Sequence, residues 1–338
     1  MSTLPEPRGP LSAHVLPALR NAPAPLPEID LPTPDDVLAD DDLQLTLYCL
    51  YELHYRGFDG VDERWEWDPG LLALRARLEA IFETALDVAL AGWDPPEADA
   101  RTMDVALRAI ADADDSPSLS RYLEVRGTLD EFYEFVAHRS AYQLKEADPH
   151  SWAIPRLDGP PKAALVEVQA DEYGGGRPER MHARLFADTM AALGLDARYG
   201  AYVDRLPGVT LATVNLMSLF GLHRRHRGAI VGHLALFEMT SSIPNRRYAT
   251  ALRRLGVDDA AATAFYDEHV TADAVHENIA AVDLAGGLAR REPEQIPAIL
   301  FGARALVELD ARFAAHLLDA WAAGERSLRV ASNEAIAA

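Results

Sequence analysis

The chain is poor in cysteine, in positive charge and in long apolar runs, and each shortage excludes a class of protein. Cys49 is the only cysteine among 338 residues, so no intrachain disulfide can form and no second thiol supports a zinc or iron–sulfur site. Lysine and arginine number 32, against 53 aspartates and glutamates, and the formal charge of −21 argues against nucleic-acid and anionic-membrane partners. No stretch approaches the roughly 18 uninterrupted apolar residues that indicate a transmembrane helix.

A cytoplasmic location is expected from the same shortages. A chain without disulfides fits a reducing compartment, and the N-terminus lacks the basic segment and apolar run of a signal peptide. Hydrophobic residues make up 49 % of the chain and charged residues 25 %, which is typical of a globular protein with a sizeable core.

Strand patterns are scarce as well. No run of strict alternation exceeds four residues, whereas apolar residues at helical spacing recur from about residue 35 onward. The sequence therefore predicts an all-α protein, a helical bundle with a smaller N-terminal helical part.

Four segments are predicted along the chain. Residues 1–34 hold nine of the 22 prolines and are expected to be extended or irregular. Residues 35–100 form an N-terminal helical region, with a break at Pro95–Pro96 near its end. Residues 101–330 form the main bundle, and residues 331–338 form a fraying tail.

Residues 269–276, HVTADAVH, carry the clearest chemical pattern. Spacings of four and three residues place His269, Asp273 and His276 on one face of a helix, and all three side chains can bind a metal ion. A solvated polar helix face has the same spacing, so the rest of the chain must distinguish the two.

Four further predicted helices offer a carboxylate or an imidazole. The helix of Glu238, AIVGHLALFEM, is otherwise almost entirely apolar, and a buried carboxylate is costly unless it is paired, protonated or bound to a cation. A partner arginine or tyrosine would satisfy it equally. The other three are Glu146 in QLKEADPH, Glu172 in VQADEYGGG and His182 in PERMHARLF. Taken singly, Glu146 is also consistent with an exposed helix end, Glu172 with a helix C-terminus before glycines, and His182 with a core histidine.

Taken together, these residues resemble the haem-oxygenase-like diiron oxidases. The order glutamate, glutamate, histidine, glutamate and then histidine-x3-aspartate-x2-histidine is similar to that of the N-oxygenase branch, which includes the central domain of the nitrosourea-forming enzyme of streptozotocin biosynthesis. The resemblance covers about residues 120–320 and includes no cupin domain, so the rearrangement that the cupin carries is not expected. The metal ligands that it implies are Glu146, Glu172, His182, Glu238, His269, Asp273 and His276.

The resemblance implies a non-haem diiron oxygenase with a haem-oxygenase-like bundle. Two Fe²⁺ ions, dioxygen as co-substrate and an external electron donor are expected, and the reaction is oxidation of a nitrogen in a small amine or guanidine-like substrate. Glu172 favours this branch, since relatives that fragment fatty acids or amino acids lack it. Cleavage of an amino or fatty acid is the alternative, as is an iron-binding protein without catalytic activity. The N-terminal region resembles a dimerising segment and implies a homodimer.

The ligand assignment leaves two points open. Glu179 and His182 form the Glu-x-x-His pair of ferritin-like diiron sites, but the second such pair is missing, so Glu172 is preferred over Glu179. The expected division between the ions puts His182 and His276 on one iron and His269 with Asp273 on the other.

Two other motifs carry weaker signals. The glycines at 174–176 lack the lysine and hydroxyl residue of a phosphate loop. The basic cluster HRRHR at 223–227 is expected to be a solvated helix junction, although an arginine there, or Arg246 and Arg247, could meet a substrate carboxylate.

Overall fold

The computed structural model describes residues 2–31 and 34–330, with the side chains of residues 271–275 excepted. Within these ranges the secondary structure is helical, and a lone bridge between Ser2 and Phe58 is the only strand-like pairing. The predicted all-α class is therefore confirmed. No helix of the described part is long and apolar enough to cross a membrane.

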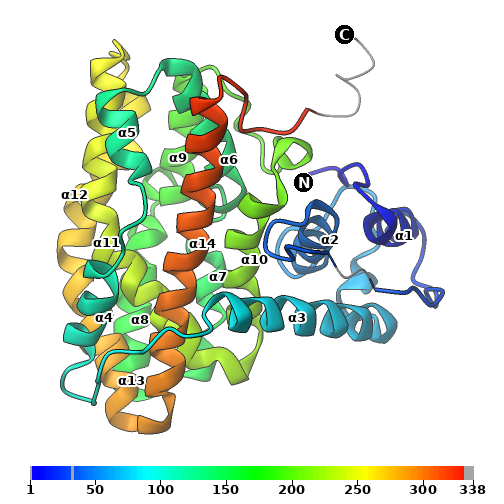
Figure 1. Cartoon of the computed structure of the whole chain (residues 1–338), viewed down its shortest axis with the longest axis horizontal. Helices are drawn as coiled ribbons and strands as arrows, with labels where there is room; N and C mark the ends of the chain where they lie inside the picture. The colour runs from blue at the N-terminus through cyan, green and yellow to red at the C-terminus, as the bar shows by residue number, and fades with distance from the viewer. Residues whose placement is uncertain (1, 32–33, 331–338) are drawn as a thin grey trace.

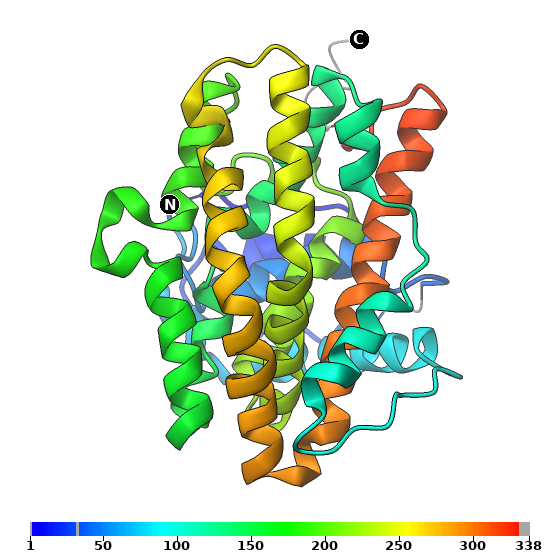
Figure 2. The ribbon, with the colours of Figure 1, turned by 90° about the vertical axis from the view of Figure 1, so that its left-hand side faces the viewer.

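The main body is a bundle in which the long helices α11, α12 and α14 run side by side (Figures 1 and 2). Shorter helices complete it around them. The bundle helices are α4 (Met103–Asp112), α5 (Leu119–Val125), α6 (Leu129–Gln143), α7 (Asp148–Ser151), α8 (Gly159–Glu172), α9 (His182–Ala192), α10 (Gly208–Leu222), α11 (Arg227–Arg254), α12 (Ala260–Asn278), α13 (Gly286–Arg291) and α14 (Ile296–Ala322).

Two glycines bring α11 and α14 into close contact. A Cβ on Gly232 would overlap the carbonyl group of Ile299, and a Cβ on Gly302 would overlap that of Ala229. The backbones of the two helices can approach this closely only because neither glycine carries a side chain. This contact fixes the position of α11, the helix that carries Glu238.

Three N-terminal helices lie on one side of the bundle: α1 (Pro10–Leu19), α2 (Asp41–Glu52) and α3 (Pro69–Ala89). In Figure 1, α1 and α2 are seen nearly end-on, and α3 lies across the bundle axis. Buried residues of all three helices belong to the same hydrophobic core as residues of α10, α11 and α14. The domain boundaries expected from the sequence stay predictions.

The prediction that residues 1–34 are extended is wrong for residues 10–19. Pro10 occupies the first turn of α1, where a proline costs no hydrogen bond, and Leu11, Val15 and Leu16 face the core. The proline count obscured this apolar helical spacing. Pro17 lies inside the ten-residue helix.

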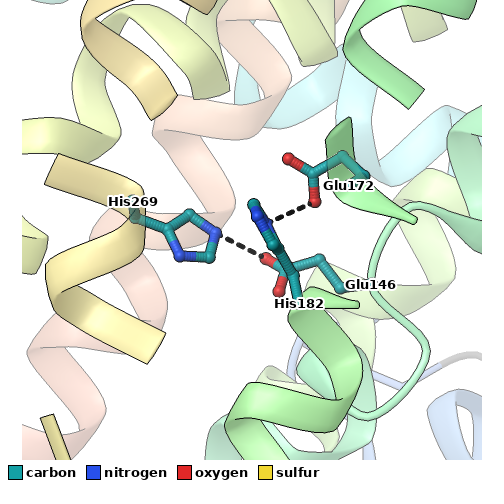
Figure 3. Close-up of side chains that lie close together, drawn as sticks. All are labelled: Glu146, Glu172, His182 and His269. Carbon is teal, nitrogen blue, oxygen red and sulfur yellow. Dashed lines mark ion pairs between the residues drawn. The ribbon is translucent and has the colours of Figure 1, made fainter. Parts of the chain in front are cut away.

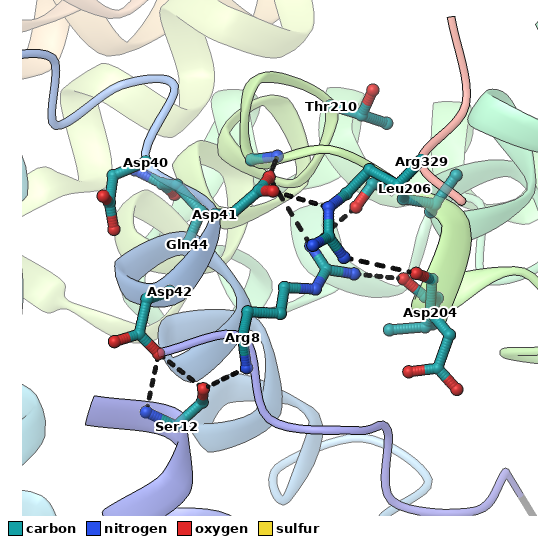
Figure 4. A network of polar contacts seen from close by, with 12 residues as sticks. Arg8, Ser12, Asp40, Asp41, Asp42, Gln44, Asp204, Leu206, Thr210 and Arg329 are labelled. Carbon is teal, nitrogen blue, oxygen red and sulfur yellow. Dashed lines mark hydrogen bonds and ion pairs between the residues drawn. The ribbon is translucent and has the colours of Figure 1, made fainter. Parts of the chain in front are cut away.

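A carboxylate of α2 caps the beginning of α1. Asp42 accepts the backbone N–H group of Ser12 at 2.7 Å (Figure 4) and that of Leu11 at 2.8 Å. A negative charge at a helix N-terminus is favourable because it meets unpaired N–H donors. Nearby, the Arg8 guanidinium donates to the carbonyl oxygens of Val203 and Leu206, both at 2.6 Å, and so ties the N-terminal segment to the bundle.

Candidate metal centre

Six of the seven predicted ligands lie together in the interior of the bundle. They form two groups, and within each group one possible ligand atom from every residue lies within 4.8 Å of all the others. The first group is Glu146, Glu172, His182 and His269, and the second is Glu172, Glu238 and His276. Asp273, the seventh, lies on α12, but its side chain is outside the described residues.

The first group joins four separate elements of the bundle, whose side chains point toward one another in Figure 3. His182 begins α9, and its Nδ1 lies 2.9 Å from Oε2 of Glu172 at the end of α8. His269 of α12 places Nε2 at 3.6 Å from Oε1 of Glu146. All four side chains are buried.

The second group adds α11 to the same centre. His276, two helical turns beyond His269 on α12, places Nδ1 at 3.4 Å from Oε2 of Glu238. Both residues are buried, at 1 % and 5 % exposure. Glu238 therefore lies beside an imidazole. The carboxylate that the sequence predicted to be buried is part of a cluster of possible metal ligands.

Glu172 belongs to both groups, whereas Glu179 belongs to neither. Glu179 lies in a short 3₁₀ turn and is exposed, so the geometry favours Glu172. The grouping also differs from the division expected from the sequence, because His182 lies with His269 rather than with His276. A helical sequence pattern does not reveal which helices face each other, and that arrangement decides the grouping.

The turn that carries Glu146 is held in place by contacts with α8 and α2. Glu146 follows the end of α6 and precedes Ala147, which has a φ of +73°, a left-handed conformation that is unfavourable for a residue with a Cβ. Gln169 of α8 donates to the carbonyl of Ala147 at 2.8 Å. On the other side, the ammonium of Lys145 lies 2.9 Å from Glu52 of α2, and both side chains are buried. The turn is therefore held from both sides.

Hydrogen bonds set the tautomers of two imidazoles. His269 donates from Nδ1 to the carbonyl of Phe265 at 2.8 Å, which leaves Nε2 as the atom that faces Glu146. His276 donates from Nε2 to Asp171 at 3.1 Å, which leaves Nδ1 facing the centre. Carboxylates and carbonyls in this outer position orient metal-binding histidines. Sequence reasoning missed Asp171, although it directly precedes Glu172.

Residues 133–311 match the protein family described as iron-containing redox enzymes. The chain belongs to this family. The matched segment contains all seven residues predicted as ligands, and no curated protein matches the chain.

The donor set of this iron-containing redox enzyme fits an iron site. It combines carboxylate oxygens with imidazole nitrogens, the donors that suit non-haem iron. Three of its buried atoms, Glu146 Oε2, His182 Nδ1 and His276 Nδ1, make no well-aligned hydrogen bond among the described residues, although the two nitrogens lie beside carboxylates. Each of these atoms retains a lone pair, or a position for one, that a metal ion can use.

The electrostatics also fit a cation. Burial by itself raises the pKa of Glu172, but His182, His269 and His276 outweigh it and lower this pKa to about 2. Burial alone would likewise lower the pKa of His276, yet pairing with Glu238 and Asp171 raises it to about 9. Without a metal, protons on the imidazoles supply the positive charge that the carboxylates attract. A bound cation would replace those protons.

Three more ionisable side chains near the centre were not predicted. His150 and His233 lie 3.2 Å apart, Nε2 to Nδ1, and burial lowers the pKa of both, to about 4 for His150. His150 lines the same small space as Glu146 and Glu172, and so does Tyr142. Burial, followed by the nearby carboxylates, raises the pKa of Tyr142 well above its usual value. His233 stands in the apolar run before Glu238, and that buried position was the available signal.

The basic cluster at 223–227 pairs with local carboxylates. Arg225 and His226 contact Glu83 of α3, and Arg227 contacts Glu292. The basic residues lie where α10 is followed by α11, in keeping with the predicted helix junction.

Proposed function

We propose that this family member is a diiron oxygenase that uses dioxygen to oxidise a nitrogen atom of a small amine or guanidine-like substrate. The observation that supports the proposal most is the sharing of Glu172 between two groups of donor atoms. Two adjacent positions that share one carboxylate match the way carboxylates link neighbouring metal ions in helical bundles.

The residues that would hold the ions follow from the two groups. Glu146, His182 and His269 would hold one ion, Glu238 and His276 would hold the other, and Glu172 would contact both. Bound ferrous iron would provide open positions for dioxygen and would pass on the electrons that the external donor supplies. Asp171 and the carbonyl of Phe265 keep the outer protons on His276 and His269 and so leave one nitrogen of each ring available.

The proposed reaction balances with an external electron donor. An amine and dioxygen, together with two electrons and two protons, give an N-hydroxyl amine and water. One oxygen atom enters the N–O bond and the other leaves as water, so the donor must provide both electrons. Burial of the centre keeps bulk water away from the reacting atoms.

Iron loading followed by exposure to oxygen tests the proposal. Metal-free protein is loaded anaerobically with Fe²⁺, the bound iron is counted, and the protein is mixed with oxygenated buffer in a stopped-flow spectrometer. We expect two ions per chain, an oxygen-dependent absorption change and, with an amine panel and a reductant, a product that has gained oxygen on nitrogen. Glu238→Ala should lose one of the two ions, whereas Glu179→Gln, a change at the exposed alternative, should keep both.

Three results would contradict the proposal in different ways. Absence of bound iron would make the cluster a structural network of ion pairs. Iron that binds without oxygen consumption would indicate storage or sensing. A product shortened by loss of carbon would favour oxidative cleavage of an amino or fatty acid.

A further inference from the structure

Gln169 carries a buried oxygen atom that none of the contacts described above uses. The residue lies on α8, one helical turn before Glu172, and is 3 % exposed. Its Oε1 atom has no hydrogen-bond partner within the described ranges. A buried acceptor without a partner is costly, so it indicates a hydrogen-bond donor that comes from outside the chain.

The nitrogen of the same amide fixes the direction of this oxygen. Nε2 of Gln169 donates to the carbonyl oxygen of Ala147 at 2.8 Å and to Oγ of Ser151 at 2.7 Å. A carbonyl oxygen can only accept, so the nitrogen must lie on the side of Ala147 and the oxygen on the other. Both N–H bonds of the amide are therefore used, and only its acceptor is left.

A chain of hydrogen bonds keeps the amide in this orientation. Tyr173 donates its hydroxyl to Oδ1 of Asp148 at 2.8 Å, so the oxygen of Tyr173 accepts from Ser151 at 2.9 Å. Ser151 has then donated its only proton and accepts from Gln169. Donation thus runs in one direction, from the amide to the carboxylate, and hydrogen bonds in such a chain polarise one another.

Gln169 lines the candidate metal centre. It borders the same small space as Glu146, Glu172 and Glu238. The volume of this space is about 10 Å³, which is the room that one water molecule needs. An NH₂ group has about the size of a water molecule, whereas a carbon skeleton is larger. Only the nitrogen end of an amine can therefore enter beside Gln169.

The charge of the centre favours an uncharged acceptor at this position. Glu146, Glu172 and Glu238 already supply three carboxylates. A carboxylate at position 169 would add a further negative charge and a further metal ligand. An amide oxygen adds no charge and accepts a hydrogen bond from any N–H or O–H group.

We propose that Gln169 binds the amine nitrogen that enters the centre, with Oε1 accepting one of its N–H bonds. Ser151 and Tyr173 are positioning residues that keep the amide turned this way. A nitrogen without an N–H bond offers Gln169 no donor, so the site should select primary and secondary amines against tertiary ones. That the bound nitrogen is the oxidised atom rests on the function proposed above.

Calorimetric titration of the iron-loaded full chain under anaerobic conditions tests this assignment. The probes are trifluoroethylamine, which is uncharged near pH 7 and carries N–H bonds, and its N,N-dimethyl derivative, which carries none. Gln169→Met keeps the length of the side chain and removes the acceptor. We expect the ratio of the two affinities to fall about fivefold in this variant, the loss of one neutral hydrogen bond. A purely steric preference would keep the same ratio.

Comparing the two probes within one protein separates binding from structural damage. Gln169→Met also removes the donor to Ala147, but any change in the turn or in iron content affects both probes alike. Gln295→Met is the matched control: its Oε1 is also buried without a partner, but it lies beside Gly228, about 15 Å along α11 from Glu238. This control should leave the ratio unchanged.

An unchanged ratio in Gln169→Met, or no binding of trifluoroethylamine to the wild type, would overturn the assignment. If Gln169→Met fails to fold or to bind iron, Gln169→Asn withdraws the amide by one methylene group and should lower the ratio as well. The titration needs no oxygen, so it is independent of the oxygenase. A lowered ratio without oxygen consumption by the wild type would sustain the role of Gln169 and refute the oxygenase. Oxygen transfer to an amine with an unchanged ratio would do the opposite.

Discussion

The buried ion pair between Lys145 and Glu52 should stabilise both the fold and the turn that carries Glu146. The two charged atoms lie 2.9 Å apart, with side-chain exposures of 1 % and 0 %. Tyr199 donates its hydroxyl to both oxygens of Glu52, at 2.8 and 2.7 Å. Removing one partner would leave a charge buried in the core, whereas removing both would leave none.

The expected cost can be estimated from these contacts. Breaking a buried ion pair costs about 3–5 kcal/mol of unfolding free energy. Glu52→Gln should fall near 3 kcal/mol, because the ammonium of Lys145 keeps a cation–π contact with Tyr55 at 4.2 Å and the amide can still accept from Tyr199. Lys145→Met should cost a similar amount. The double variant should lose only about 1 kcal/mol, since no charge remains unpaired.

Urea unfolding of the four proteins, followed by circular dichroism, measures this coupling. Each single variant should also bind iron more weakly than the wild type, because Glu146 directly follows Lys145. Arg184→Gln breaks an exposed pair with Asp188 and should leave the urea midpoint unchanged. Additive losses in the double variant, or single losses below about 1 kcal/mol, would refute the reasoning.

Three other variants separate the contributions of individual side chains. Glu172→Gln should prevent binding of both ions, whereas removal of a ligand that belongs to one group only should spare the other ion. If metal analysis shows the same loss of iron in both kinds of variant, Glu172 is not shared between two ions. Asp171→Asn should weaken iron affinity about 10–100-fold in competition with a chelator, through lost orientation of His276. Burial lowers the pKa of His150 to about 4, so the unfolded chain, with a pKa near 6.5, takes up the proton first as the pH falls. The unfolding free energy should thus decline from pH 7 to pH 5, and His150→Gln should reduce that decline by roughly 2 kcal/mol. If the decline is the same in the variant, His150 is not its cause.

The sequence predicted those parts of the structure that depend on spacing along one helix. Apolar periodicity predicted the all-α class, and the spacing from His269 to His276 places both imidazoles on the inner side of α12. The apolar surroundings of Glu238 predicted its burial. Each of these inferences needs only local geometry and the cost of burying charge.

The remainder depends on contacts between distant segments. Sequence spacing could not show that His182 faces His269, or that Asp171 lies against His276 across 105 positions. The proline-rich start concealed α1 because proline count measures a tendency, whereas Pro10 is favourable in the first helical turn. Tertiary contacts decide such cases.

The cluster and the Lys145–Glu52 pair show why a buried carboxylate alone does not identify a metal site. Glu52 and Glu238 are both buried, and each requires a positive partner. Glu52 meets an ammonium group that the chain itself provides, so no cation is needed. Glu238 meets His276, whose positive charge depends on a proton that a bound cation can replace. The identity of the partner, more than the burial, separates a structural carboxylate from a candidate ligand.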